Sequence, residues 1–244
     1  VDEWLTDEQT PLALKERLAL TQQIRRFAVT ELGLPDNASY QAYADLQRRA
    51  VVWNVVAAPA FSLQLKTWCF PVTGCVGYRG YFDEAQAKAQ AQALQQDGWE
   101  VEVYGVPAYS TLGWLNWAGG DPLLNTFIHY PEGELARLIF HELAHQVLYV
   151  ADDTAFNESF ATAVERLGVA QWLAQAGHDD AQRAFAAQDA KRQQFRQLTQ
   201  ATRAALARMY KENEALARDN NVLLAMKNAA MQNFKASYEA LKGQ

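Results

Sequence analysis

The hydrophobic and polar positions of this chain follow two different periods. In most of the sequence apolar residues recur at the spacing of a helix, which indicates amphipathic helices. The pattern predicts helices at residues 12–32, 39–49, 83–97, 135–150, 154–176, 178–210 and 213–241. Shorter alternating or β-branched stretches predict strands at residues 76–82, 99–103 and 124–129. Residues 51–58 fit either a strand or the buried end of the helix before them, since periodicity does not distinguish the two.

This succession of elements predicts a mainly helical α+β fold, with a small sheet beside a C-terminal region of long helices. Half of the 244 residues are hydrophobic, which is enough for a sizeable core. We expect a single unit over residues 1–244. Within it we expect N-terminal helices in 1–50, a small α/β lobe in 51–130 and a helical lobe in 131–244.

The helix expected at residues 135–150 carries the pentad His-Glu-Leu-Ala-His, from His141 to His145. Side chains at positions i and i+4 lie on one face of a helix, so the two imidazoles can share a metal ion. Glu142 then projects beside that ion and can take a proton from a water bound to it. The alternative is a helix with two surface histidines. We disfavour it because the flanking residues are apolar and the chain holds only four histidines.

A third ligand is expected, because a catalytic zinc ion usually has three protein ligands. Residues 151–154 have the composition of a turn and a helix cap, and the next helix carries Glu158. If the two helices pack antiparallel, Glu158 and His145 lie at a similar height. The sequence therefore predicts one Zn²⁺ held by His141, His145 and Glu158, with Asn157 as a supporting residue.

An extended segment before the motif helix is a candidate for binding substrate. In zinc peptidases the edge strand at this place commonly pairs with an extended peptide. The candidates are Ser110, Thr111, Leu112 and Gly113. The alternative is an ordinary core strand in which Gly113 only turns the chain.

Other roles of a peptidase site fall on residues near the pentad. Tyr149 and Tyr109 are candidates for stabilising the oxyanion of the reaction. Three further carboxylates near the pentad, those of Glu132, Glu134 and Glu165, are candidates for binding a charged group of a substrate. Glu165 is also the nearest carboxylate on the face of Glu158, so we expect it to support the ligands from outside.

The two cysteines of the chain, Cys69 and Cys75, flank a segment with Pro71 and Gly74 that allows the chain to turn back. We prefer a disulfide between them, which would indicate an oxidising compartment. The alternative is a pair of reduced, buried thiols.

Charge and hydropathy argue against a nucleic-acid partner and against a transmembrane helix in this chain. The net charge is −6, with acidic and basic residues interspersed and no basic stripe, so we expect no nucleic-acid partner. No apolar run reaches the length of a transmembrane helix. The chain opens with Val-Asp-Glu-Trp, from which we expect a mature or trimmed protein whose targeting segment is not included in this sequence.

Three stretches together resemble a family of bacterial proteins described as predicted zinc aminopeptidases, often predicted lipoproteins. They are CFPVTGCVGYRGYF (69–82), YSTLGW (109–114) and the stretch from LIFHELAHQVLYV to DTAFNESFATAVERLG (138–168). The resemblance implies a zincin-like fold, a peptide substrate, and the same zinc ligands and general base as those inferred above. It also implies export to the periplasm or envelope, with a lipid anchor upstream of this chain.

These features predict a zinc metallopeptidase, which the resemblance narrows to an aminopeptidase. Such an enzyme needs an acidic group for the free amino end of its substrate, and Glu132, Glu134 and Glu165 are available. The alternatives are an endopeptidase of the same mechanism and a non-catalytic envelope binding protein. The presence of Glu142 disfavours the binding protein, because a structural metal site has no use for a base. The chain also departs from better-known gluzincins: only residues 146–157 separate His145 from Glu158, and Thr162 stands where those families have an acidic residue.

Overall fold

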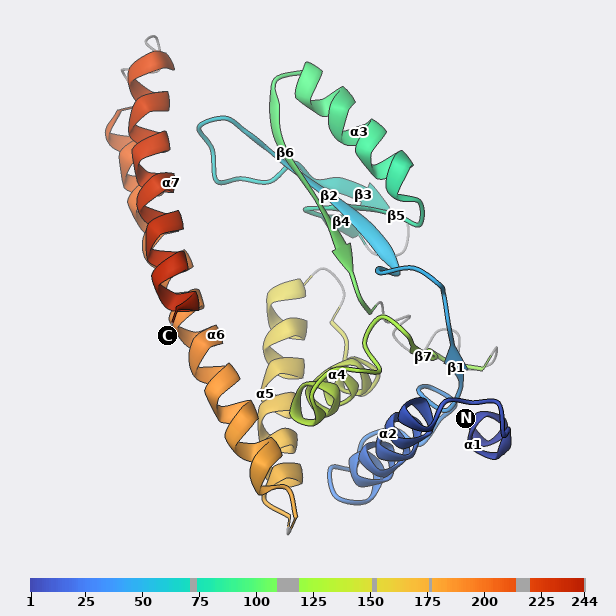
Figure 1. Cartoon of the computed structure of the whole chain (residues 1–244). Coiled ribbons are helices and arrows are strands. Elements are labelled where there is room, and N and C mark those ends of the chain that lie inside the picture. The colour runs from blue at the N-terminus through green and yellow to red at the C-terminus, as the bar shows by residue number, and fades with distance from the viewer. Residues whose placement is uncertain (71–73, 109–118, 151–152, 176, 214–219, 244) are drawn as a thin grey trace.

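A computed structural model describes residues 1–70, 74–108, 119–150, 153–175, 177–213 and 220–243, and it is mainly helical with small sheets. The helices are α1 (Asp2–Thr6), α2 (Leu12–Thr30), α3 (Glu84–Gln96), α4 (Glu132–His145), α5 (Thr154–Leu173), α6 (Asp179–Glu212) and α7 (Asn220–Lys242). The strands are β1 (Tyr43–Ala44), β2 (Val52–Pro59), β3 (Trp68–Phe70), β4 (Gly74–Val76), β5 (Arg79–Tyr81), β6 (Trp99–Val106) and β7 (Leu123–Leu124). Figure 1 shows their arrangement. The mainly helical α+β class is thereby confirmed.

A three-stranded antiparallel sheet, in the order β5–β2–β6, forms one lobe of the molecule (Figure 1). β2 is the central strand, so residues 51–58 form a strand rather than the end of a helix. Its β-branched and apolar residues fit a buried, pleated surface. α3 covers one face, and the buried residues of this small core are Val55, Ala57, Ala87, Ala91 and Leu94.

The strand expected at residues 76–82 is divided in two. β4 pairs with β3, and β5 joins the larger sheet after a bend at Gly77. Cys69 and Cys75 stand opposite each other in the β3–β4 pair and form a disulfide bond. This bond ties together two strands that are too short to be stable alone.

Residues 39–49 do not form the expected helix. The backbone of Tyr40 has a φ of 62°, which interrupts a right-handed helix. β1 instead pairs in parallel with β7, and the Asn125 side chain accepts a hydrogen bond from the amide of Leu46 and donates one to the carbonyl of Arg48. These partners lie far along the chain, so local periodicity could not indicate them. Among the first fifty residues, therefore, only the stretch up to Thr30 is helical.

The strand expected at residues 124–129 is also wrong beyond its first residue. β7 ends at Leu124, whose carbonyl accepts hydrogen bonds from the amides of Phe127 and Ile128. The segment is therefore a turn. Phe127 and Ile128 are nevertheless fully buried, which explains why the sequence here has the apolar character of a strand.

The main core lies where α2, α4 and α5 meet, together with the turn at Phe127 and Ile128. α5 approaches this core closely at Gly168. A Cβ at that position would lie 2.7 Å from Leu32 Cδ1 and 2.9 Å from Phe140 Cδ2, both below van der Waals contact. Glycine therefore lets α5 pack tightly against α4. In Figure 1 the two helices cross, with α5 running down the page toward the start of α6.

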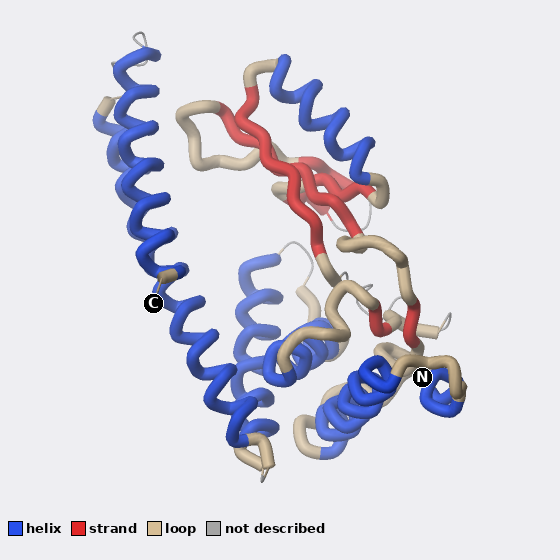
Figure 2. The backbone as a smooth tube through the Cα atoms, in the orientation of Figure 1, coloured by secondary structure: helices blue, strands red, loops and turns tan. Residues whose placement is uncertain are grey.

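The two long C-terminal helices were expected, and α6 and α7 form a hairpin along one side of the molecule (Figure 2). Arg192 of α6 pairs with Glu134 of α4, and Lys227 of α7 pairs with Glu100 of β6. The hairpin thus contacts both the helical core and the sheet lobe. Among the residues that the structure describes, no helix is both long enough and apolar enough to cross a membrane.

Candidate metal centre

The pentad lies at the C-terminal end of α4, which the core encloses. Leu138, Ile139 and Leu143 on this helix are buried and hold it in place. The helix ends at His145, earlier than the residue 150 that the sequence pattern suggested, and Gln146 is its C-cap. The imidazoles of a buried helix are thus presented at its last turn, where the chain leaves toward α5.

His141, His145 and Glu158 come together from these two helices. The Nε2 atoms of the two histidines are 3.1 Å apart. One carboxylate oxygen of Glu158 lies 3.3 Å from His141 Nε2, and the other lies 3.6 Å from His145 Nε2. The three residues form a group in which one ligand atom from each lies within 4.8 Å of the others, and this group could hold a metal ion.

The distances between these atoms fit a zinc ion. Nitrogen and oxygen ligands lie about 2.0–2.1 Å from zinc, and in a tetrahedron this places any two ligand atoms about 3.3–3.4 Å apart. The 3.1 Å between the two nitrogens and the 3.3 Å from His141 Nε2 to one Glu158 oxygen are close to that value, while the 3.6 Å from His145 Nε2 is measured to the other oxygen of the same carboxylate. Two nitrogens and one carboxylate are also the donor set of many catalytic zinc sites, in which the fourth position stays open for water or substrate.

Glu165 lies about two helical turns beyond Glu158 on the same face of α5, and it orients His141. His141 Nδ1 lies 2.8 Å from Glu165 Oε2, and the hydrogen on Nδ1 donates to this carboxylate. In the neutral imidazole, donation from Nδ1 leaves the lone pair on Nε2, the atom that faces His145 and Glu158. Arg137 lies 3.4 Å from the same Glu165 oxygen and also pairs with Glu134, so the buried carboxylate is held by a cation.

The charges around the group favour a cation at its centre. Burial lowers the pKa of His141, but hydrogen bonds to Glu158 and Glu165 and the negative charge of Glu142 raise it to about 10. The hydrogen bond to His141 lowers the pKa of Glu158, which keeps this carboxylate ionised. Burial and the charge of His141 lower the pKa of His145.

Asn157, adjacent to Glu158, fixes the connection between α4 and α5. Its side chain is buried, accepts a 2.8 Å hydrogen bond from the amide of Val150 and donates one of 2.7 Å to the carbonyl of the same residue. Asp153 caps the start of α5 through the amide of Phe156. These contacts set where α5 begins, and hence where Glu158 stands relative to the histidines.

Two supporting residues gave no signal in the sequence. Arg137 balances Glu165 from another helix, and the two are neighbours only because α4 and α5 cross. Tyr40 is buried, and its pKa is raised well above 10 by burial and by the negative charges of Glu142 and Asp121. The positive φ of Tyr40 is the kind of feature that only the folded chain reveals.

The other candidates from the sequence are placed as follows. Tyr149 lies in the connection after α4 rather than on that helix, and its side chain is exposed. Tyr109 and the stretch 110–113 lie outside the described residues. Glu132 accepts a 2.9 Å hydrogen bond from the indole of Trp172 and pairs with His178, so its carboxylate has structural partners.

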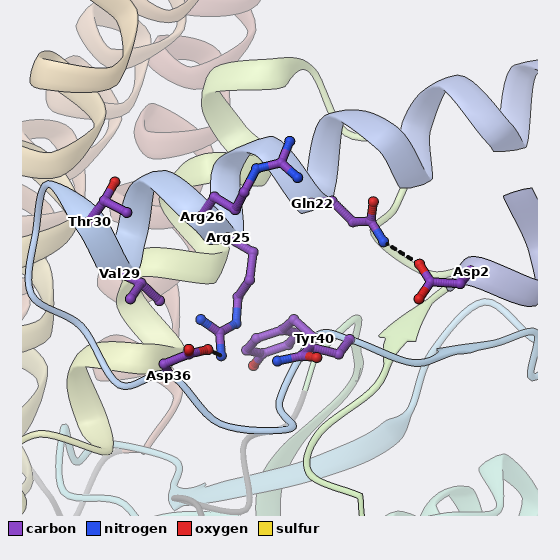
Figure 3. A pocket seen from close by; sticks show the side chains of 9 residues that line it. Asp2, Gln22, Arg25, Arg26, Val29, Thr30, Asp36 and Tyr40 are labelled. Carbon is purple, nitrogen blue, oxygen red and sulfur yellow. Dashed lines mark hydrogen bonds and ion pairs between the residues drawn. The ribbon is translucent and has the colours of Figure 1, made fainter.

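A hollow of about 460 Å³ lies against α2, away from the three ligand residues, and Figure 3 shows it. Gln22 donates a 3.0 Å hydrogen bond to Asp2 across it, and Arg25 lies 3.6 Å from Asp36. A second, shallow and open groove of about 640 Å³ lies along the exposed side of α5; its lining residues all belong to that helix and include Glu158. The groove that reaches the metal group is therefore the candidate place for a substrate.

Comparison with known proteins identifies one family. The sequence model of the family described as "Putative aminopeptidase" matches residues 1–244 of the chain. Neither the curated proteins nor the solved structures include a match.

Proposed function

The chain belongs to the family described as "Putative aminopeptidase", and on that premise we propose that it is a zinc-dependent aminopeptidase with a zincin-like fold. The family membership implies a peptide substrate. The observation that supports the zinc-dependent mechanism is the convergence of His141 Nε2, His145 Nε2 and the Glu158 carboxylate, with one ligand atom from each residue within 4.8 Å of the others. The whole chain would act as one peptidase unit.

In this proposal each residue has a separate task. His141, His145 and Glu158 would hold the ion, and Glu165 would keep His141 in the correct tautomer. Zinc, when bound, polarises a carbonyl group and lowers the pKa of water to about 7. Glu142 would accept a proton from that water and pass it to the leaving amine.

The position of Glu142 suits this task. It lies next to His141 on α4 and is partly exposed, and its charge contributes to the raised pKa of His141. A base must lie within reach of the water that it deprotonates, and residues beside the first ligand of such a pentad flank the ion.

The disulfide bears on the compartment in which the protein works. The Cys69–Cys75 bond is compatible with an oxidising environment. Together with the family, it supports a periplasmic or envelope-associated peptidase.

The function is tested by combining metal analysis with peptide digestion. We expect the purified protein to hold about one zinc ion per chain and to release the first residue of a tetrapeptide such as Ala-Ala-Ala-Ala. The N-acetylated form of the same peptide should resist cleavage, because an aminopeptidase requires a free amino end. Mass spectrometry of the products would detect both reactions. Equal cleavage of the blocked peptide would indicate an endopeptidase instead, and zinc binding without any cleavage would indicate a binding protein.

A further inference from the structure

The groove along α5 starts at the proposed metal group. Its lining residues are Glu158, Ser159, Thr162, Ala163, Arg166 and Leu167, which succeed one another along one side of the helix. Glu158 is shared between the groove and the metal group. A substrate whose scissile bond lies at the metal would therefore continue along this groove. The side chains next to Glu158 are small, so an extended backbone can approach α5.

Arg166 is the cation in this lining, and it is available to a ligand. Its side chain is about half exposed, at 52%, and its nearest acidic partner is Asp189 of α6 at 3.6 Å. Asp189 also accepts a 3.2 Å hydrogen bond from Arg192 and one of 2.7 Å from Gln193. Asp189 would therefore keep two partners if Arg166 turned toward a bound molecule.

We propose that Arg166 is a specificity-determining residue that binds a carboxylate of the peptide on the C-terminal side of the scissile bond. This proposal rests on the proposed peptidase function. An arginine presents paired donors that match a carboxylate. It repels the free ammonium group of an aminopeptidase substrate, so the amino end lies away from this groove and the remainder of the peptide occupies it.

The distance between Glu158 and Arg166 sets the length of peptide that is recognised. At 1.5 Å rise per residue, the eight residues from 158 to 166 span about 12 Å along α5. Helical side chains lean toward the N-terminus, so the guanidinium can turn from Asp189 back toward Glu158. An extended peptide covers about 3.3–3.6 Å per residue. The recognised carboxylate therefore lies about two to four residues beyond the scissile bond, as a free C-terminus or as an Asp or Glu side chain.

Binding to a zinc-loaded Glu142→Gln protein tests the proposal without relying on turnover. The probes are Ala-Ala-Ala-Ala, its C-terminal amide, and Ala-Ala-Ala-Asp amide, titrated calorimetrically. We expect the free acid to bind about tenfold more tightly than the tetra-alanine amide, since a charged hydrogen bond commonly contributes that factor. Arg166→Gln should remove the difference and Arg166→Lys should retain some of it. Binding of Ala-Ala-Ala-Asp amide as tight as that of the free acid would show that Arg166 also recognises side-chain carboxylates.

Arg183→Gln is the matched control, because Arg183 also pairs with an aspartate, Asp180, but does not line the groove. This control should keep the preference for the free acid. Equal affinities for acid and amide, a preference that survives Arg166→Gln, or no binding of either peptide would overturn the proposal. A different result would refute the proposed peptidase function alone: zinc-loaded wild-type protein would cleave no peptide but would still bind the free acid more tightly than the amide. Cleavage of acid and amide with equal kcat/KM would refute only the role of Arg166.

Discussion

Replacing Glu142 with glutamine is expected to lower kcat/KM for peptide hydrolysis by about 10²–10⁴-fold while leaving zinc bound. General-base catalysis contributes a factor of this size, and an amide cannot accept the proton from water. Glu142 is not among the three residues that converge as ligands, so its substitution removes the base and not the coordination. The measurement is the rate of release of the first residue from a tetrapeptide, with the zinc content determined on the same sample.

The control for this variant is Glu84→Gln, at a surface carboxylate in the first turn of α3 that pairs with Lys88. It should hydrolyse peptides at the wild-type rate. Circular dichroism should show the same helical content in both variants. Normal turnover by Glu142→Gln with zinc bound would contradict the assignment of the base.

Replacing Glu158 with alanine is expected to weaken zinc binding by more than about 100-fold. Removing a residue that only supports a ligand costs about 10–100-fold in metal affinity, and removing a ligand should exceed this. The Glu158 side chain is 56% exposed, so its loss leaves no cavity in the core and the fold should persist. Competition with a chromophoric chelator measures the zinc affinity. Glu165→Gln should lower this affinity by only about 10–100-fold, because Glu165 contacts His141 Nδ1 and no other atom of the group.

An exposed position on the same helix gives the matched control. Gln171 of α5 is exposed and outside the group, so Gln171→Ala should bind zinc as the wild type does. If Glu158→Ala bound zinc as tightly as Gln171→Ala, the third ligand would have to be another residue.

The elements of the fold that could be predicted are those in which local sequence decides the structure. α4 was predicted because its apolar residues recur at helical spacing, and the core buries that same face. Glu158 could be placed because a short turn and the rise of a helix limit where the next side chains can lie. Both inferences needed only neighbouring residues and regular geometry.

The parts of the structure that the sequence predicted wrongly or did not indicate depend on contacts between distant segments. Residues 39–49 have a helical pattern, but Asn125 and β7 supply hydrogen bonds that hold them in another conformation. The contact between Arg137 and Glu165 requires the crossing of α4 and α5, which no local pattern encodes. Likewise no local pattern marks Arg166, because its place in the groove and its pairing with Asp189 exist only in the folded chain.

X-ray diffraction from zinc-loaded crystals, with anomalous data collected on both sides of the zinc absorption edge, tests the central proposal most directly. We expect one strong anomalous peak per chain, about 2.0–2.2 Å from His141 Nε2, His145 Nε2 and a carboxylate oxygen of Glu158. A peak bound elsewhere, or the two imidazoles turned away from each other with Glu158 out of reach, would contradict the assignment of a catalytic zinc site.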